Sequence, residues 1–210
     1  MRFIELNNKT LLSLLNEYSD TLLKDKSKLT DINYWTSNIN ADKATSNQYL
    51  EDIKNNPEHN GWPIDQWGYD FCFLSDQGII ENDFADFVDD IKLKINMELS
   101  TKHNALMMLY PHNGFIGWHT NENCPGYNIL LSYSEKGAGF FRYEDPKTKE
   151  IVTMQDKPGW TAKVGYFGYN DDDIFWHSAR TYDEFRLTCS FVIPHKEMWE
   201  MMIEDIECND

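Results

Sequence analysis

Apolar side chains recur at helical spacing in several parts of the chain. Over 10–24, and again over 84–99, they return every three or four positions, which is the spacing of a helix with one apolar stripe. A shorter helix is predicted over 41–53, and the tail over 194–210 carries the same spacing. The long stripes need a surface to cover, so we expect these helices to back a sheet. The stripe residues are Leu11, Leu15, Tyr18 and Leu22 in the first helix and Phe84, Phe87, Val88, Ile91, Ile95 and Leu99 in the second.

A different pattern begins at Asn104, where the apolar runs become short and rich in β-branched or aromatic residues. Turn residues separate these runs at short, regular intervals, which is typical of an all-β sandwich or barrel. One earlier strand is predicted over 69–74. Eight runs after Asn104 predict a double-sheet jelly roll. The runs cover 105–110, 115–119, 127–133, 139–144, 150–154, 159–167, 174–179 and 186–193.

We expect the whole chain, residues 1–210, to form one domain. A chain of this length buries roughly 70% of its unfolded surface in a single core, and a second core would be cramped. The prediction divides it into a helical N-terminal region with one strand over 1–103, a jelly-roll core over 104–194 and a C-terminal helix over 195–210. The predicted fold is mostly β with flanking helices.

Charge and cysteine content narrow the class of protein. The formal net charge is −16, and a field of that sign repels nucleic-acid backbones and anionic membrane surfaces. The four cysteines are scattered without a Cys-x-x-Cys pair, so neither a zinc knuckle nor a disulfide framework is predicted. The N-terminus lacks the apolar core of a signal peptide. We expect a soluble cytoplasmic protein that acts on a small molecule or a peptide, with an oligomeric state that the sequence leaves open.

Two histidines in the strand-rich half are the candidate metal ligands. His119 and His177 occupy similar places in short β-type runs, each directly after a tryptophan. Imidazole is the commonest metal ligand at neutral pH, and two of them on neighbouring strands with a carboxylate nearby suit non-haem Fe(II). Arg186 and Thr188 alternate onto one face of the last strand. A guanidinium there matches a carboxylate with two parallel bonds, so this face could hold a dicarboxylate beside the metal. The other four histidines are interpreted as ordinary residues.

These residues carry a family resemblance. The pattern Tyr110-x-x-x-Gly114-x-x-x-x-His119, followed by His177 and then Arg186-x-Thr188, resembles the Fe(II)/2-oxoglutarate-dependent dioxygenases. The likeness is greatest to prolyl hydroxylases and aspartyl/asparaginyl β-hydroxylases, and it covers about 106–194.

The resemblance implies a fold, an activity and a set of roles. The fold would be a double-stranded β-helix, and the reaction a hydroxylation that converts 2-oxoglutarate and O₂ to succinate and CO₂. His119 and His177 would bind Fe(II), and Arg186 would pair with the distal carboxylate of 2-oxoglutarate. Hydroxyls of Thr188 and Tyr110 would also contact this cosubstrate. Asn128 would lie on the wall of the pocket.

One position departs from the family pattern. Most of these enzymes have Asp or Glu two positions after the first histidine, whereas this chain has Asn121. We place Asn121 at the metal as a neutral, weaker ligand, and a site with two imidazoles alone stays open. Glu122 is the alternative donor, although on a regular strand it points away from His119. The departure also leaves open a catalytically silent jelly roll that serves as a binding or structural module. A halogenase would need an empty position, which Asn121 is too large to leave.

Other residues near the predicted site have two interpretations. Trp118, Trp160 and Trp176 are interpreted as core packing that shields the metal, and the alternative is stacking of a ring substrate. The acidic run 171–173 is interpreted as a solvated loop. Its alternatives are attraction of a cationic substrate and hydrogen bonds to a metal-binding histidine.

Overall fold

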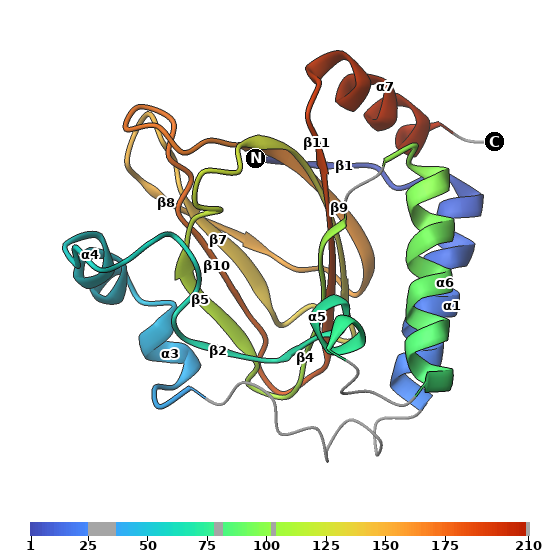
Figure 1. Ribbon diagram of the computed structural model, residues 1–210, viewed down its shortest axis with the longest axis horizontal. Helices are drawn as coiled ribbons and strands as arrows, with labels where there is room; N and C mark the ends of the chain where they lie inside the picture. The colour runs from blue at the N-terminus through green and yellow to red at the C-terminus, as the bar shows by residue number, and fades with distance from the viewer. Residues whose placement is uncertain (25–36, 78–81, 102–103, 209–210) are drawn as a thin grey trace.

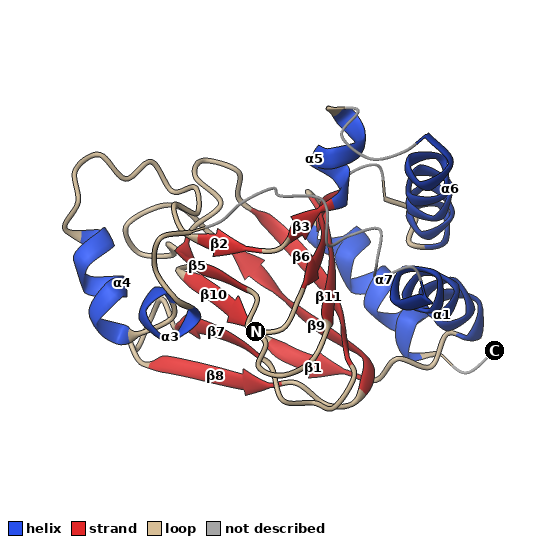
Figure 2. Ribbon diagram, turned by 90° about the horizontal axis from the view of Figure 1, so that it is seen from below, coloured by secondary structure: helices blue, strands red, loops and turns tan. Residues whose placement is uncertain are grey.

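The computed structural model describes all residues except 25–36, 78–81, 102–103 and 209–210. Two antiparallel sheets face each other across a shared interior, and helices lie on both sides of this pair (Figures 1 and 2). The described part of the chain is therefore mostly β, with a few helices, as the hydrophobic pattern predicts. The division of the chain into one domain with three regions stays a prediction.

One sheet has six strands and the other five. In the first the spatial order is β1-β9-β6-β11-β4-β3, and in the second it is β2-β5-β10-β7-β8. The first sheet contains β1 (Arg2–Ile4), β9 (Gly159–Phe167), β6 (Gly126–Ser134), β11 (Arg186–Ile193), β4 (Asn104–Tyr110) and β3 (Tyr69–Asp70). The second contains β2 (Gln66–Trp67), β5 (Phe115–His119), β10 (His177–Arg180), β7 (Phe140–Glu144) and β8 (Ile151–Gln155).

The six-stranded sheet presents one face to the helices and the other to the interior. Successive residues of a strand point to opposite faces, and β11 shows this with Leu187, Cys189 and Phe191 in the core under the helices. Thr188 and Ser190, on the alternate positions, line the interior cavity. The period-two pattern of the last strand therefore separates structural from candidate functional side chains.

Long helices cover the outer face of the six-stranded sheet. They are α1 (Lys9–Lys24), α6 (Asn82–Glu98) and α7 (Lys196–Glu207), which lie together on that side of the molecule in Figure 2. Their apolar stripes, represented by Leu15, Ile91 and Ile203, enter the same core as Leu131 and Leu187 of the sheet. Each such side chain contributes about 1.5 to 3 kcal/mol on full burial, before conformational entropy is subtracted. The sequence prediction that the helix over 84–99 backs a sheet is confirmed, and α1 packs on the surface that its stripe was predicted to need. The tail over 194–210 was predicted to cap the barrel or to meet a partner, and α7 packs on the same sheet.

Two short helices cover the five-stranded sheet on the opposite side. They are α3 (Ala41–Ala44) and α4 (Asn47–Lys54). The sequence predicted one helix over 41–53, and this prediction is wrong in one respect. The side chain of Ser46 accepts a hydrogen bond from the amide of Tyr49, which starts a second helix at Asn47 and breaks the first.

The predicted strand over 69–74 is also corrected. Only Tyr69 and Asp70 pair with β4, and the chain then forms the helix α5 (Phe71–Asp76). The carboxylate of Asp70 accepts from the amide of Cys72, which caps this helix. Strand β10 begins at His177, later than predicted, and the strand β1 was not predicted at all.

Among the described residues, the helices lack the combination of length and apolar composition that a membrane crossing requires. In the described part of the chain, the cysteines at 72, 124, 189 and 208 are not joined by disulfides.

Candidate metal and ligand site

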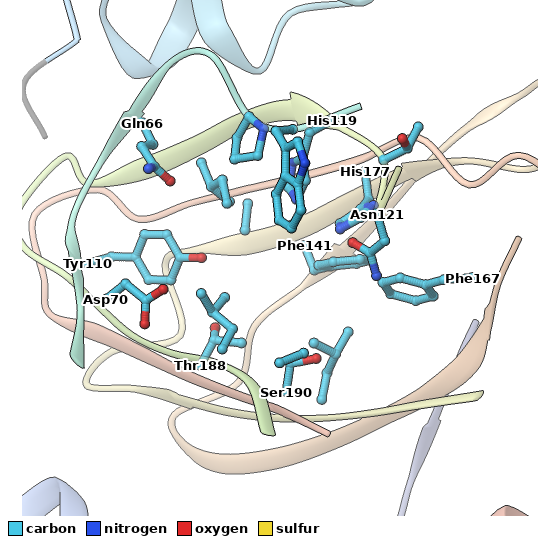
Figure 3. A pocket seen from close by; sticks show the side chains of 18 residues that line it. Gln66, Asp70, Tyr110, His119, Asn121, Phe141, Phe167, His177, Thr188 and Ser190 are labelled. Carbon is cyan, nitrogen blue, oxygen red and sulfur yellow. The ribbon is translucent and has the colours of Figure 1, made fainter. Parts of the chain in front are cut away.

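His119 and His177 lie directly opposite each other on neighbouring strands. Strand β5 ends at His119, β10 begins at His177, and the two residues are partners in the register of the five-stranded sheet. Their ring centroids are 4.1 Å apart, and Figure 3 shows both rings at one side of a cavity between the sheets. The structure therefore brings together two residues that the sequence separates widely.

The same pattern of hydrogen bonds fixes both imidazoles. Nδ1 of His119 lies 2.8 Å from the carbonyl oxygen of Gly117, and Nδ1 of His177 lies 3.1 Å from that of Phe175. A carbonyl oxygen only accepts, so each Nδ1 carries a proton and donates it. The Nε2 atom of each ring is then left with a lone pair. Two such Nε2 atoms, on residues that are partners across neighbouring strands, form a donor pair suited to a transition metal.

Burial keeps both rings uncharged at neutral pH. It lowers the pKa of His119 to about 4, against a raising effect of the Gly117 carbonyl, and His59 nearby lowers it further. Burial also lowers the pKa of His177 well below its ordinary value, and the neighbouring His119 adds to this effect. Protons therefore do not compete with a metal ion at this pair between pH 6 and 8, roughly the range in which an ordinary histidine titrates.

The metal-free protein is expected to lose stability as the pH falls below about 6.5. The unfolded chain protonates His119 near that pH, whereas the folded protein, with a pKa of about 4, does not. The free energy of unfolding should therefore drop by about 2 kcal/mol between pH 7 and 5 from this group alone. Urea unfolding of wild type and His119→Gln at both pH values measures the difference. His112→Gln is the matched control, since His112 is exposed and paired with Asp183. An equal pH slope in wild type and His119→Gln would contradict the prediction.

Asn121 lines the same cavity as the two histidines. It lies in the loop that follows β5, and Figure 3 shows its side chain beside His177. Glu122 is directed elsewhere. Its carboxylate is exposed and accepts a hydrogen bond of 2.8 Å from the indole of Trp62, so the alternative of Glu122 as a ligand is not supported. Within the described residues, no three His, Cys, Asp or Glu side chains converge as a metal site.

The cavity has a volume of about 360 Å³ and extends from the histidines to the six-stranded sheet. Tyr110 and Asp70 lie across it from His177, and the hydroxyl of Tyr110 points into the open space (Figure 3). Thr188 lines the cavity as well. Burial raises the pKa of Tyr110 to about 12, although Arg186 and Thr188 lower it. Tyr110 is therefore a neutral hydroxyl that donates or accepts a hydrogen bond at neutral pH.

Arg186 lies behind Thr188, on the side of that residue away from the cavity. It is 1% exposed and does not itself line the cavity. Its Nε donates to Asp156 over 2.7 Å, one terminal nitrogen donates to the hydroxyl of Thr188, and the other lies 3.4 Å from the hydroxyl of Ser132. The guanidinium also lies 5.1 Å from the centre of the Tyr110 ring. Its positive charge is therefore adjacent to Thr188 and Tyr110, whose hydroxyls would contact the same ligand according to the family resemblance.

Asn128 lies deeper than predicted. Its side chain donates to the carbonyl of Gly126 and accepts from Ser190, which itself lines the cavity. It is 1% exposed and stands behind the pocket wall. Asn128 thus supports Ser190 in the structure, and a direct role toward a ligand stays a prediction.

The three tryptophans near the histidines in sequence are packing residues. Trp118 donates to the carbonyl of Ser46 and packs with Trp176 under α4, outside the cavity. Trp160 packs in the core beneath the long helices. Packing in the core is confirmed for all three, while shielding of a metal stays a prediction, since none of them lines the cavity. In the acidic run 171–173, the carboxylate of Asp173 accepts a hydrogen bond from the amide of Asn170 within a turn. The ring of His177 donates to the carbonyl of Phe175, and not to this acidic run.

Sequence reasoning missed the residues that the segment from Trp62 to the end of β3 contributes to the cavity. Trp62, Gln66 and Asp70 all line it, and Trp62 is 54% exposed. The amide of Thr120, directly after His119, donates to the carbonyl of Gly61 and holds this segment beside the histidines. The sequence signal was the density of tryptophan, proline and glycine over 62–68, which indicated a turn-rich approach to a strand but not the position of these turns in the fold.

Comparisons with known proteins give distant likenesses. No family model matches the sequence, and no curated protein matches it. A prolyl-4-hydroxylase from Pseudomonas putida is similar in structure at a TM-score of 0.33 and 15% identity, over 51% of this chain and 61% of that one.

Two proteins from Thermotoga maritima are similar at a comparable level. A predicted oxalate decarboxylase has a TM-score of 0.24 and 19% identity, over 42% of this chain and 64% of its own. A cupin-like protein has a TM-score of 0.25 and 15% identity, over 44% and 57%. All three solved structures are thus matched over less than two thirds of their own length.

Proposed function

We propose that this protein is an Fe(II)- and 2-oxoglutarate-dependent oxygenase that hydroxylates a small molecule or a protein side chain. The observation that carries the proposal is the pair of neutral imidazoles at one side of a cavity, with 4.1 Å between their ring centroids. Two hydroxyls at the other side of the same cavity, one of which accepts a hydrogen bond from the buried guanidinium behind it, support 2-oxoglutarate as the cosubstrate.

The strand order supports a double-stranded β-helix, the jelly roll of this enzyme class. Along the chain from β4 to β11, successive strands alternate between the two sheets, except that β7 and β8 pair as a hairpin. The central strands of one sheet run β9-β6-β11-β4 and those of the other β5-β10-β7-β8. This winding places β5 and β10 side by side, which is what brings His119 to His177.

The residues present fit a metal ion. Each Nε2 is free to coordinate because each Nδ1 is occupied by a carbonyl. The amide oxygen of Asn121, which lines this side of the cavity, would be the third protein donor, and because it is neutral, iron would be held less tightly than by a carboxylate. When bound, iron and 2-oxoglutarate supply the activation of dioxygen and the oxidation of a C–H bond.

The residues present also fit a dicarboxylate. Its distal carboxylate would accept hydrogen bonds from the hydroxyls of Thr188 and Tyr110, both of which line the cavity. Arg186 donates to Thr188 from behind, and a hydroxyl polarised by a cation is a stronger donor. Such charge-assisted contacts to a buried carboxylate contribute about 1.5 to 3 kcal/mol each.

The apolar walls would exclude water from the reacting atoms. The rings of Phe167 and Phe141 lie 4.8 Å and 5.6 Å from the ring of His177, and Ile116 and Leu130 complete this part of the cavity. A dry site strengthens the electrostatic contacts inside it and protects a reactive oxidant from side reactions. The chain's own contribution is therefore to bind, orient and shield the cofactors.

A second candidate is a silent jelly-roll module that binds a ligand without catalysis. The observation that favours it is the absence, among the described residues, of a carboxylate beside the two histidines. Such a module would bind metal weakly and would not couple metal binding to binding of a 2-oxo acid.

The experiment that separates the two adds 2-oxoglutarate to the Fe(II)-loaded protein without oxygen. An oxygenase is expected to develop a visible metal-to-ligand charge-transfer band. Its melting temperature should also rise by about 5 °C or more at a ligand concentration of 100 Kd. Succinate, which lacks the 2-oxo group and cannot chelate the metal, is the control and should give no band. A well-folded protein that shows neither band nor shift would favour the silent module.

A further inference from the structure

Three charged side chains are buried together behind the cavity wall. Arg186 of β11 and Lys163 of β9 both contact the carboxylate of Asp156, which follows β8. Nε of Arg186 lies 2.7 Å from one oxygen, and Nζ of Lys163 lies 2.9 Å from the other. The three residues are 1%, 0% and 4% exposed, respectively. We call them the charge triad.

The charge triad faces the interior and not the helical layer. Lys163 is the register partner of Leu130, and Leu130 lines the cavity. Directly paired residues of antiparallel strands point to the same face, so Lys163 points inward too. Its sequence neighbours Ala162 and Val164 lie in the core under the helices, on the opposite face.

The charge triad contains two cations and one carboxylate. Among the described residues, neither Arg186 nor Lys163 has a second ion pair. A further buried carboxylate, Glu184, raises the pKa of Arg186 through its charge, but its hydrogen bonds come from the hydroxyl of Ser134 and from backbone amides of the turn over 136–139. The triad alone therefore carries a net charge of +1 in a buried environment, where an unmatched charge is unfavourable.

We propose that Lys163 is a positioning residue for anion binding, because it neutralises Asp156 and so leaves the charge of Arg186 available to a ligand carboxylate. Asp156 holds the Nε edge of the guanidinium, which directs a terminal nitrogen to Thr188 on the cavity wall. Without Lys163, Asp156 would cancel the charge of Arg186. The inference rests on the proposed function and specifies the distal carboxylate of the 2-oxo acid as the group selected.

The test compares two 2-oxo acids on the Mn(II)-loaded protein by calorimetry. 2-Oxoglutarate carries the distal carboxylate, and 2-oxobutyrate lacks it. Lys163→Met is expected to weaken 2-oxoglutarate binding about tenfold or more and to leave 2-oxobutyrate binding unchanged, since it removes one nearby charge. The double variant Lys163→Met/Asp156→Asn removes both charges, returns the site to +1, and is expected to restore most of the lost affinity.

The charge-restoring double variant distinguishes this role from simple packing. A structural defect at Lys163 would weaken both 2-oxo acids and would not be repaired by a second substitution. If Lys163→Met does not fold, Lys163→Gln and Lys163→Gln/Asp156→Asn provide the same comparison. Wild-type protein that binds both acids equally would overturn the proposed cosubstrate, and the inference with it. Wild-type protein that prefers 2-oxoglutarate, together with an unchanged preference in the single variant, would overturn the role of Lys163 alone.

Discussion

Replacing His177 by alanine is expected to abolish the response of the protein to metal ions. The ring supplies one of two Nε2 donors, and the remaining donors would be one imidazole and one neutral amide. Loss of residues that merely support a ligand typically costs 10- to 100-fold in metal affinity, so loss of the ligand itself should cost about 100-fold or more. Calorimetric titration with Mn(II) of the protein without added 2-oxo acid measures this directly.

His195→Ala is the matched control for this experiment. His195 is exposed, precedes α7 and has no hydrogen bond as its cap, so its loss should leave metal binding at the wild-type level. His177→Ala removes a buried side chain, and far-ultraviolet circular dichroism has to show that the variant is folded. A folded variant that binds Mn(II) as tightly as wild type would place the metal somewhere else, or show that no site exists.

Asn121→Asp is expected to tighten metal binding about 10-fold or more. The substitution keeps the side-chain shape and replaces a neutral oxygen by a charged one, which completes a set of two imidazoles and one carboxylate. Its side chain lies beside His177 in the cavity (Figure 3). The tighter binding should appear both in the Mn(II) titration and as a higher melting temperature at a fixed metal concentration.

Asn123→Asp controls for the added charge. Asn123 is exposed in the same loop, so the substitution changes the net charge equally without facing the histidines. It should alter the Mn(II) affinity less than about threefold, because exposed charges are screened by salt. Equal effects of the two substitutions on the Mn(II) affinity would indicate a general electrostatic attraction of the metal ion. They would contradict the prediction that Asn121 is a metal ligand.

Hydrophobic periodicity predicted the strand-rich half well for a physical reason. Its strands are paired in antiparallel ladders with one face under helices, so period-two alternation is enforced by burial on that face. The alternation along β11 also predicted correctly that Arg186 and Thr188 share a face. The convergence of His119 and His177 followed from the family resemblance and from their similar places in the pattern, and the register confirms it.

Features that depend on packing between distant segments were not predictable in this way. Lys163 and Asp156 meet only because β9 and the end of β8 come together in space, and a lysine within a strand normally indicates an exposed position. The available sequence signal for an inward-facing Lys163 was the alternation along its strand, which puts Lys163 on the face opposite to its apolar neighbours Ala162 and Val164. Trp62 was missed because its place depends on the bond between its indole and Glu122.

Short helices were mispredicted because single side chains decide where they begin. Asp70 converts a β-type run into α5 by capping the amide of Cys72, and Ser46 divides the predicted helix over 41–53. Caps of this kind contribute about 1 kcal/mol, which is enough to change a short element but not a long one. The long helices α1 and α6 were predicted almost to their ends because many apolar contacts define them.

The central claim is that His119 and His177 hold one metal ion beside a bound 2-oxo acid. A crystal structure of the protein soaked with Mn(II) and 2-oxoglutarate, with anomalous scattering measured for manganese, tests it most directly. We predict a single manganese peak within coordination distance of both Nε2 atoms. 2-Oxoglutarate should chelate this ion, with its distal carboxylate at Thr188 and Tyr110. A structure with no manganese between the two rings, or with 2-oxoglutarate bound away from Thr188, would contradict the account.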